Sequence, residues 1–468
     1  MTTPLVGVPS VQAAPSWRSL PARQQPHWPD ASALDSAVQT LGRSLPLVFP
    51  RECDLLKRRL AAVARGEAFL VQGGDCAESL DAADAASIGR TVATLRQLAT
   101  VLGHAMALPV VTVGRLAGQY AKPRSASTET RDGVELPVYR GDAVNGSAFT
   151  AAARTPDPQR LVRIYNASAA TLNLVRAFGM RERMGAAEAG DGLREFAAGS
   201  PSRERYEELV AGIDQAGGLV AADGVHTPGD LFTSHEGLLL DYESALTRTD
   251  VDTGKRYAVS GHLLWIGERT RQLDGAHVAY FAGISNPIAV KIGPGIGTDE
   301  LLQLIDRLDP ERDPGRLSLI VRMGAERIRD VLPDLVAKVT AEGFPVGWMS
   351  DPMHGNTIGA PCGRKTRRFD DVLDELSGFF EVTSGLGVHP GGVHLELTGD
   401  DVTECVGGAP GLTFDDLPDR YRSLCDPRLN REQALDLAFR LADTLACRPG
   451  GGRTPAAGGH PGAGLRHG

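Results

Sequence analysis

Four positively charged side chains stand at or near the ends of four different apolar segments of this sequence. They are Arg115, Arg269, Lys291 and Arg322. If the fold gathers them at one place, they repel one another unless an anion neutralises them. Guanidinium groups pair with carboxylate and phosphate oxygens through two hydrogen bonds, and an ammonium supplies a compact charge. In a chain whose formal net charge is −9, these residues predict a pocket for an anion that carries several charges.

A thiol, an imidazole and two carboxylates form a second set, which predicts a metal site. Cys76, His354 and Glu396 also stand at the ends of apolar segments, and Asp426 follows the last of them. Such a mixture of soft and hard donors suits Mn, Fe, Co or Zn better than Mg or Ca. No local motif such as HExxH or CxxC is present, and Cys76 taken alone is typical of a small buried hydrophobe. The metal interpretation therefore requires that all four residues meet.

Two further groups of basic and hydroxyl residues follow the second and the seventh apolar segment. The first group contains Lys122, Arg124 and Ser125, and the second contains Lys365, Arg367 and Arg368. The first group predicts either a second phosphate site or a solvated loop. In the second group, Lys365 is the candidate site residue. A charged helix start is the favoured interpretation for Arg367 and Arg368.

Short apolar segments alternating with helical patterns must position these side chains. Eight such segments run over residues 68–76, 109–115, 236–243, 262–269, 287–294, 317–324, 345–354 and 392–399. They are almost continuously apolar, which is typical of parallel strands covered on both faces. Helical patterns occupy 87–103, 298–308, 325–343 and 367–387. The alternation predicts an α/β fold of the (β/α)8 TIM barrel type, whose active site lies at the carboxyl ends of the strands. An open doubly wound sheet is the alternative, but no strand-ending GxGxxG supports it. In the third segment, the polar residues placed at the end are Asp241 and Glu243.

The two ends of the chain differ from the middle. Residues 1–60 are expected to form an N-terminal extension that packs on the barrel or on a partner subunit, because they contain Trp17 and Trp28. Residues 61–447 form the predicted barrel, with inserted helices around 180–235. The Gly/Pro/Ala-rich residues 448–468 have little to bury and are expected to be disordered.

Composition excludes several classes of protein. Apolar residues make up 42% of the 468 residues, enough for a large buried core. The excess of acidic over basic residues argues against nucleic-acid binding, and no apolar run reaches the ~18 residues of a membrane-spanning helix. The N-terminus lacks the pattern of a secretory signal, and the six cysteines lack the spacing of a disulfide framework. We therefore expect a cytoplasmic protein.

Ten motifs together resemble the class II 3-deoxy-D-arabino-heptulosonate 7-phosphate (DAHP) synthases. The similarity runs from about residue 15 to residue 445. The motifs are QGGDCAES (72–79), GRLAGQYAKPRS (114–125), YRGDAVNG (139–146), LLLDYESALTR (238–248), WIGERTRQLDGAHVAYFAGISNPIAVKIGP (265–294), RMGAERI (322–328), SDPMHGNT (350–357), KTRRF (365–369), GGVHLELTGDDVTECVGG (391–408) and CDPRLN (425–430).

The resemblance implies an enzyme that condenses phosphoenolpyruvate with erythrose 4-phosphate and releases phosphate, the first step of the shikimate pathway. The implied metal ligands are Cys76, His354, Glu396 and Asp426. The implied phosphoenolpyruvate site consists of Arg115, Glu268, Arg269, Lys291 and Arg322. Lys122, Arg124 and Ser125 match the stretch implicated with the aldose phosphate, and Lys365 matches an active-site lysine. We expect the catalytic roles to fall on Lys291, Glu268, Arg322 and His354.

Several expectations about partners complete the hypothesis. The metal is expected to be Mn²⁺ or Co²⁺, with Zn²⁺ and Fe²⁺ as alternatives. We expect a homodimer or homotetramer, and a chorismate mutase is a further candidate partner. Two other functions stay open from the sequence: a synthase of the amino analogue of DAHP in a specialised pathway, and a non-catalytic barrel that regulates a partner. The motifs do not separate the first of these from DAHP synthesis, whereas every metal ligand and anion-binding residue is present, which argues against the second.

Overall fold

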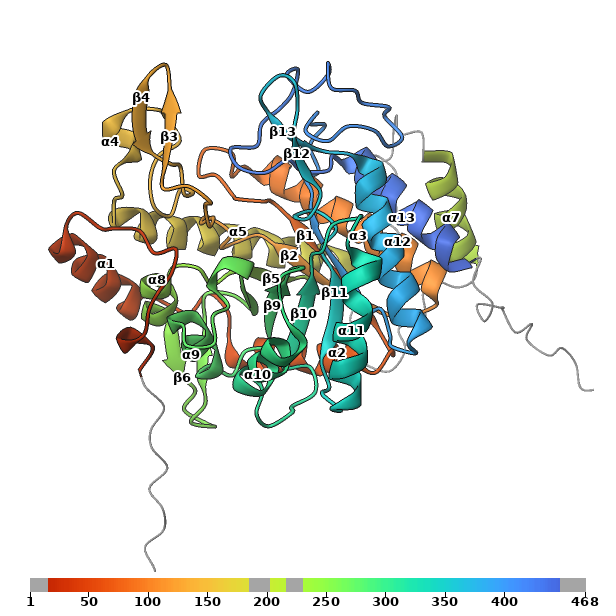
Figure 1. Cartoon of the computed structure of the whole chain (residues 1–468), viewed down its shortest axis with the longest axis horizontal. Helices are drawn as coiled ribbons and strands as arrows, with labels where there is room; N and C mark the ends of the chain where they lie inside the picture. The colour runs from red at the N-terminus through yellow and green to blue at the C-terminus, as the bar shows by residue number, and fades with distance from the viewer. Residues whose placement is uncertain (1–15, 185–202, 216–229, 447–468) are drawn as a thin grey trace, which may run out of the picture.

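A computed structural model describes residues 16–184, 203–215 and 230–446. Eight parallel strands close into a barrel (Figure 1), in the order β1-β14-β11-β10-β9-β8-β5-β2. The barrel closes where β1 pairs with β14, from Leu70 opposite Gly392 to Gly74 opposite Glu396. The strands are β1 (Phe69–Gly74), β2 (Val110–Arg115), β5 (Phe232–Glu236), β8 (Leu263–Ile266), β9 (Ile288–Ile292), β10 (Leu317–Val321), β11 (Gly347–Ser350) and β14 (Gly392–Glu396). The predicted (β/α)8 barrel is confirmed.

Helices pack around the barrel, and the four predicted helical segments are all helical. These are α3 (Ala85–Met106), α10 (Thr298–Leu308), α11 (Ile328–Ala341) and α12 (Phe369–Gly385). Further helices on the barrel are α8 (Leu240–Ala245), α9 (Ala276–Ala282) and α13 (Arg431–Ala446). Asp299 and Glu300 lie in the first turn of α10, where carboxylates interact favourably with the helix dipole.

Alternation along the strands determines which side chains enter the barrel. Val113 and Ala289 belong to the apolar cluster inside the barrel, whereas Val290 belongs to the cluster under the outer helices. Side chains two residues apart on a strand point to the same side. Arg115 follows Val113, and Lys291 follows Ala289, so both lie on the inner side at the carboxyl end. Glu396 lies on the same side, because its neighbour Leu395 packs outward.

The third strand was predicted at residues 236–243, which is about one strand length too late in the sequence. The strand is Phe232–Glu236, and the sequence after it forms the short helix α8. The run Leu238–Leu240 is apolar because it packs against neighbouring helices, so an apolar run alone did not distinguish strand from helix. Asp241 and Glu243 consequently lie on α8 rather than at a strand end. Glu243 accepts a hydrogen bond from Ser260 and contacts His235 at 2.8 Å, and no contact in the described structure joins it to the site residues.

A long excursion separates β2 from β5. It begins with the hairpin of β3 (Thr128–Arg131) and β4 (Val134–Pro137), which projects from the barrel beside α4 (Ala151–Arg154) in Figure 1. It continues with α5 (Gln159–Met184) and α7 (Arg203–Gln215). Parts of the predicted insertion, 185–202 and 216–229, lie outside the described residues, as does the predicted tail 448–468. The last predicted residues of the insertion, 232–235, belong to strand β5.

The N-terminal extension packs on the barrel of its own chain. It contains η1 (Trp17–Ser19), α1 (Ala31–Arg43) and α2 (Pro50–Ala64). The Trp17 ring meets the edge of Tyr280, with 6.3 Å between ring centroids. Helix α2 lies beneath the strands (Figure 1) and adds Leu56 and Leu60 to the apolar cluster inside the barrel. This end of the barrel is therefore filled, which leaves the carboxyl ends of the strands for a site.

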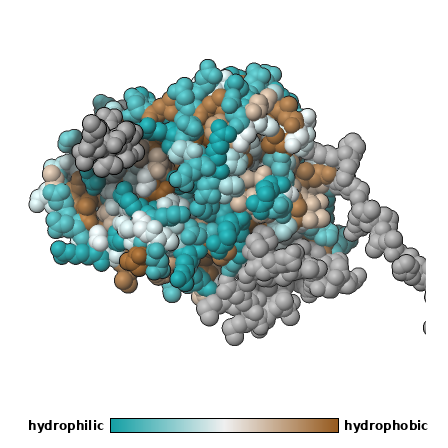
Figure 2. Space-filling model, turned by 90° about the horizontal axis from the view of Figure 1, so that it is seen from below, coloured by the Kyte–Doolittle hydropathy of each residue, from teal (hydrophilic) through white to brown (hydrophobic). Residues whose placement is uncertain are grey.

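The surface below this end is mostly hydrophilic, with separate hydrophobic patches (Figure 2). Among the described residues, no helix has the length and apolar character needed to cross a membrane.

Candidate functional site

Three ligand groups from separate parts of the chain converge at the carboxyl end of the barrel. His354 follows β11, Glu396 ends β14, and Asp426 lies in the loop before α13. One ligand atom from each lies within 4.8 Å of the other two. The Nε2 atom of His354 is 2.9 Å from Oε1 of Glu396. Three of the four predicted metal-ligating residues are thus brought together.

The thiol of Cys76 lies beside this group rather than within it. Its sulfur accepts a hydrogen bond from the backbone N–H of Asp426 at 3.4 Å and is 3.3 Å from Oγ of Ser423. Burial raises the pKa of the thiol, while the ammonium of Lys122 opposes this rise. A metal ligand must be the thiolate. The ligand role of Cys76 therefore stays a prediction.

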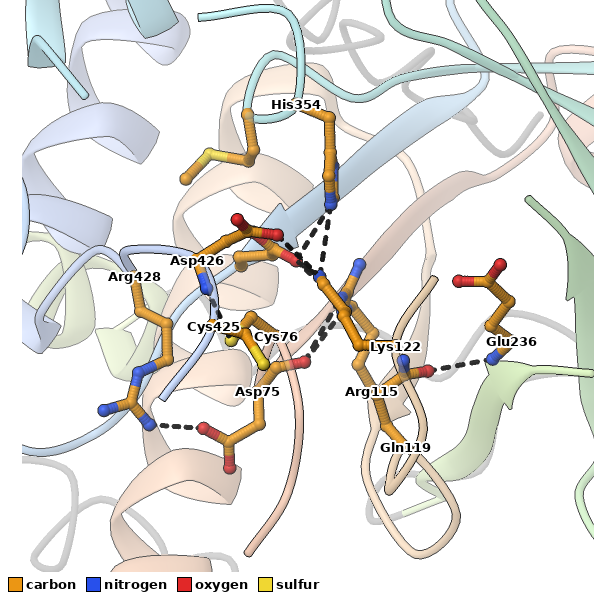
Figure 3. A network of polar contacts seen from close by, with 12 residues as sticks. Asp75, Cys76, Arg115, Gln119, Lys122, Glu236, His354, Cys425, Asp426 and Arg428 are labelled. Carbon is orange, nitrogen blue, oxygen red and sulfur yellow. Dashed lines mark hydrogen bonds and ion pairs between the residues drawn. The ribbon is translucent and has the colours of Figure 1, made fainter. Parts of the chain in front are cut away.

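The ammonium of Lys122 contacts every residue of this group, and Figure 3 shows it between His354 and the loop of Asp426. Its Nζ atom lies 2.7 Å from Glu396, 3.2 Å from Asp426 and 3.5 Å from Nε2 of His354. Burial opposes its charge, but the carboxylates of Glu396 and Asp426 raise the pKa of Lys122 above its ordinary value. Two carboxylates and an imidazole thus gather around one positive charge, and the same donor set can hold a divalent metal.

Two buried arginines hold the Glu396 carboxylate in place. Arg115 donates to Oε1 at 3.0 Å, and Arg367 donates to Oε2 at 2.7 Å. Burial of Glu396 opposes ionisation, but the charges of His354, Lys122 and the two arginines hold its pKa well below the usual range. The expected helix start at Arg367 was wrong. This side chain lies on β13 (Lys365–Arg367), is fully buried, and also bonds Thr357 and the carbonyl of Pro427.

Asp351 and Lys291 orient the imidazole of His354 from the opposite side. The Nδ1 atom of His354 lies 2.8 Å from Asp351, and Lys291 lies 2.8 Å from the same carboxylate. Burial lowers the pKa of His354, so the neutral ring is favoured. Nδ1 faces the Asp351 carboxylate, and Nε2 faces the Glu396 carboxylate at 2.9 Å. A ring that carries its proton on Nδ1 would present the Nε2 lone pair to a metal bound beside Glu396. The same arrangement of carboxylate and histidine supports the ligands of metal sites.

Arg322 and Glu268 line the side of the mouth next to β9. Arg322 donates to the carbonyl of His354 at 2.8 Å, and Glu268 accepts from Arg271 at 2.9 Å. A Cβ added at Gly293 would lie 3.1 Å from both Arg322 and Glu268, so a glycine lets them approach. Buried Nε of Arg322 and buried Oε2 of Glu268 have no hydrogen-bond partner within the described structure. Buried polar atoms are normally paired, so these two favour a bound polar ligand.

The loop after β2 carries the remaining predicted substrate-binding residues to the same mouth. Arg269 donates to the hydroxyl of Ser125 at 2.8 Å. Arg124 donates to the sulfur of Cys425 at 3.4 Å, next to Asp426 in sequence. Lys365 donates to Asp426 at 2.8 Å while remaining half exposed. All the predicted site residues therefore lie around one end of the barrel.

Glu236 is a site residue that sequence reasoning missed. It ends β5 and is buried among the positive charges of Lys291, Lys122, Arg115 and Arg269. Gln119 accepts a hydrogen bond from its backbone N–H at 2.8 Å (Figure 3), whereas its own Oε1 is unpartnered in the described structure. Burial raises the pKa of Glu236, and the nearby cations oppose this rise. A correct end for the third strand would have revealed it.

The sequence of this chain is similar to a known family and to named proteins of that family over nearly its whole length. The model of the Class-II DAHP synthetase family matches residues 12–442. The phospho-2-dehydro-3-deoxyheptonate aldolase of Streptomyces coelicolor is 58% identical over 438 residues, covering 93% of this chain and 97% of that protein. The phospho-2-dehydro-3-deoxyheptonate aldolase AroG of Mycolicibacterium smegmatis is 48% identical over 436 residues, covering 91% and 93%. A solved structure of the phospho-2-dehydro-3-deoxyheptonate aldolase of Francisella tularensis SCHU S4 has a TM-score of 0.45 and 14% identity, covering 89% of this chain and 97% of that one.

Proposed function

This chain belongs to the class II DAHP synthase family, and we propose that it condenses phosphoenolpyruvate with D-erythrose 4-phosphate and water. The products are DAHP and inorganic phosphate, and the reaction is the first step of the shikimate pathway. One structural observation carries the proposal: a cluster of cations and a three-residue metal-ligand group share one barrel mouth. Two phosphorylated substrates, one of them also a carboxylate, need such a concentration of positive charge.

Phosphoenolpyruvate fits the part of the mouth around β8, β9 and β10. Lys291 and Arg322 supply positive charge there, and the buried Nε of Arg322 has no partner among the described residues. Arg269 extends this surface from the loop after β8. Arg115 is committed to Glu396, His394 and the carbonyl of Asp75, so it forms the floor of the site and adds charge from below. Preorganised cations stabilise the charge that builds up as phosphate leaves.

A divalent metal fits the group of His354, Glu396 and Asp426, with Cys76 as the fourth candidate ligand. The fit rests on the donor atoms themselves, which surround the ammonium of Lys122. When bound, such a metal supplies a Lewis acid that polarises the aldehyde carbonyl. The mixed donors favour Mn²⁺ or Co²⁺, with Zn²⁺ and Fe²⁺ as alternatives.

The reaction joins C3 of phosphoenolpyruvate to the aldehyde carbon of the second substrate. As this bond forms, the aldehyde oxygen takes up a proton and becomes a hydroxyl. Water then adds at C2, and the C2–O bond to phosphate breaks with its electron pair leaving on the phosphate. The oxygen of the water becomes the C2 carbonyl and gives up two protons, one of which balances the proton taken up by the aldehyde oxygen. Burial lowers the pKa of Lys291 to about 8 despite the opposing charge of Asp351, so its Nζ can hold or release a proton near neutral pH. Oε1 of Glu236, which has no partner in the described part of the chain, is a second proton acceptor, and Glu268 can hold a water.

The proposal also includes the oligomeric state and the cellular location of the protein. We infer a homodimer or homotetramer that works in the cytoplasm, as sequence reasoning predicts. A chorismate mutase partner stays a prediction that no observation on this chain tests.

The decisive experiment is a phosphate-release assay with both substrates. We expect release only when phosphoenolpyruvate and erythrose 4-phosphate are both present, loss of release with a chelator, and recovery with Mn²⁺ or Co²⁺. Because neither substrate contains nitrogen, turnover in this assay is turnover to DAHP itself and not to its amino analogue. Absence of phosphate release under metal-replete conditions would refute the proposed function. Adding Phe, Tyr and Trp to the same assay tests feedback inhibition.

A further inference from the structure

The N-terminal arm reaches the rim of the barrel at Gln24. The side-chain amide of Gln24 pairs with the main chain of Arg124, 100 residues away. Its Oε1 accepts from the Arg124 N–H at 3.0 Å, and its Nε2 donates to the Arg124 carbonyl at 3.2 Å. The backbone carbonyl of Gln24 accepts from the guanidinium of Arg140 at 3.2 Å. One residue of the arm thus fixes both arginines.

The backbone of Gln24 is unusual at this position. Its φ is 62°, in the left-handed region that costs a side-chain-bearing residue free energy. Such a conformation persists where surrounding contacts over-determine it, and it gathers at functional sites. Here the contacts are the three hydrogen bonds to Arg124 and Arg140.

Arg140 and Arg124 meet at Gln24, whose carbonyl binds the Arg140 guanidinium and whose amide binds the main chain of Arg124. Burial and the charge of Arg124 both lower the pKa of Arg140. Throughout the described structure, neither guanidinium forms an ion pair with a carboxylate. The carbonyl of Arg140 also accepts from the backbone N–H of Lys122 at 2.9 Å, which joins both arginines to the loop that carries Lys122. Two neighbouring arginines without a carboxylate partner favour a doubly charged oxyanion.

We propose that Gln24 and Arg140 complete the subsite for the phosphate of the aldose phosphate. Arg140 contacts that phosphate together with Arg124, and Gln24 is a positioning residue that fixes both. The inference rests on the proposed function. It assigns to the N-terminal extension a part in the specificity for the second substrate, exerted through the two arginines that Gln24 positions.

Steady-state kinetics of the metal-loaded full chain test the inference. Arg140→Ala should raise the KM for erythrose 4-phosphate about tenfold or more, the scale of one charge-assisted hydrogen bond, and leave the KM for phosphoenolpyruvate within about twofold. Gln24→Asn keeps an amide and tolerates the left-handed backbone, but its shorter side chain cannot reach Arg124, so it should raise the same KM. The matched control is Arg23→Ala, which removes an exposed cation from the same arm.

Two further comparisons separate phosphate binding from structural damage. With D-erythrose replacing the phosphate ester, kcat/KM of wild type and Arg140→Ala should become equal within about twofold, because the lost contact is absent from both. Gln24→Glu removes the donor to Arg124 and adds a negative charge beside both arginines, so it should raise the KM for erythrose 4-phosphate more than Gln24→Asn.

Three results would overturn the inference. One is an unchanged KM for erythrose 4-phosphate in Arg140→Ala, and another is an equal rise in the KM values of both substrates. The third is a penalty that persists undiminished with D-erythrose. A wild-type enzyme that releases no phosphate from the two substrates would refute the proposed function itself, whereas an active wild type with a normal Arg140→Ala variant refutes only this inference.

Discussion

Replacing Arg367 with lysine tests whether a buried arginine positions the metal ligands from behind. Arg367 bonds three groups: Oε2 of Glu396 at 2.7 Å, the hydroxyl of Thr357 at 3.0 Å, and the carbonyl of Pro427. Pro427 directly follows Asp426, so one guanidinium fixes two ligand-bearing segments. Lysine keeps the charge but cannot reach all three acceptors, because it lacks the planar fork.

The size of the effect follows from the number of lost bonds. If lysine keeps the bond to Glu396, two hydrogen bonds from a charged donor disappear, at about 1.5–3 kcal/mol each, so unfolding should become easier by about 3–6 kcal/mol. Loss of a group that orients metal ligands typically lowers metal affinity about 10–100-fold. Thr357→Val removes one acceptor only, and it should give a smaller effect in the same direction.

The assay for metal affinity is a Mn²⁺ titration in which electron paramagnetic resonance measures the concentration of free ion. Urea unfolding of the metal-free protein measures the stability in parallel. Arg368→Lys is the matched control, because Arg368 is exposed and contacts the ring of Phe414 rather than the ligands. Wild-type Mn²⁺ affinity in a folded Arg367→Lys protein would refute the reasoning.

Three other predictions test the site. His354→Ala or Cys76→Ala should abolish turnover stimulated by Mn²⁺ while circular dichroism stays that of a folded barrel, and chelator-sensitive turnover at the wild-type rate would contradict the ligand assignment. Arg322→Ala should weaken phosphoenolpyruvate binding by ~2–4 kcal/mol in calorimetry, the scale of breaking one side of a buried charge pair, and an unchanged affinity would place Arg322 outside the pocket. Burial raises the pKa of Glu78 from 4.5 to about 7, although the backbone N–H groups of residues 117–119 oppose this rise. A raised carboxyl pKa contributes stability that is present below pH 4.5 and is lost as the pH rises through about 7. In urea titrations, the unfolding free energy of wild type relative to Glu78→Gln should therefore fall by about 3 kcal/mol over that window. A difference that does not change with pH would contradict this prediction.

The sequence by itself determined the barrel and most of its helices. Near-continuous apolar strands and helical periods are local patterns, because a strand buried on both faces and a helix buried on one must show them in their own residues. Strand ends then placed Arg115, Lys291 and Glu396 at one rim, since all parallel strands of a barrel present their carboxyl ends together. The substrate and metal hypotheses followed from the residue types and from the family resemblance.

Tertiary structure alone decided which side chains contact one another. Arg367 resembles a surface cation in sequence, but Glu396 and Pro427 enclose it from segments 29 and 60 residues away. The position of β5 in the barrel is what identifies Glu236 as a residue of the site. The contact of the N-terminal arm with Arg124 is what identifies Gln24. The physical reason is that barrel closure sets these distances between segments remote in the chain, and local periodicity contains no information about them.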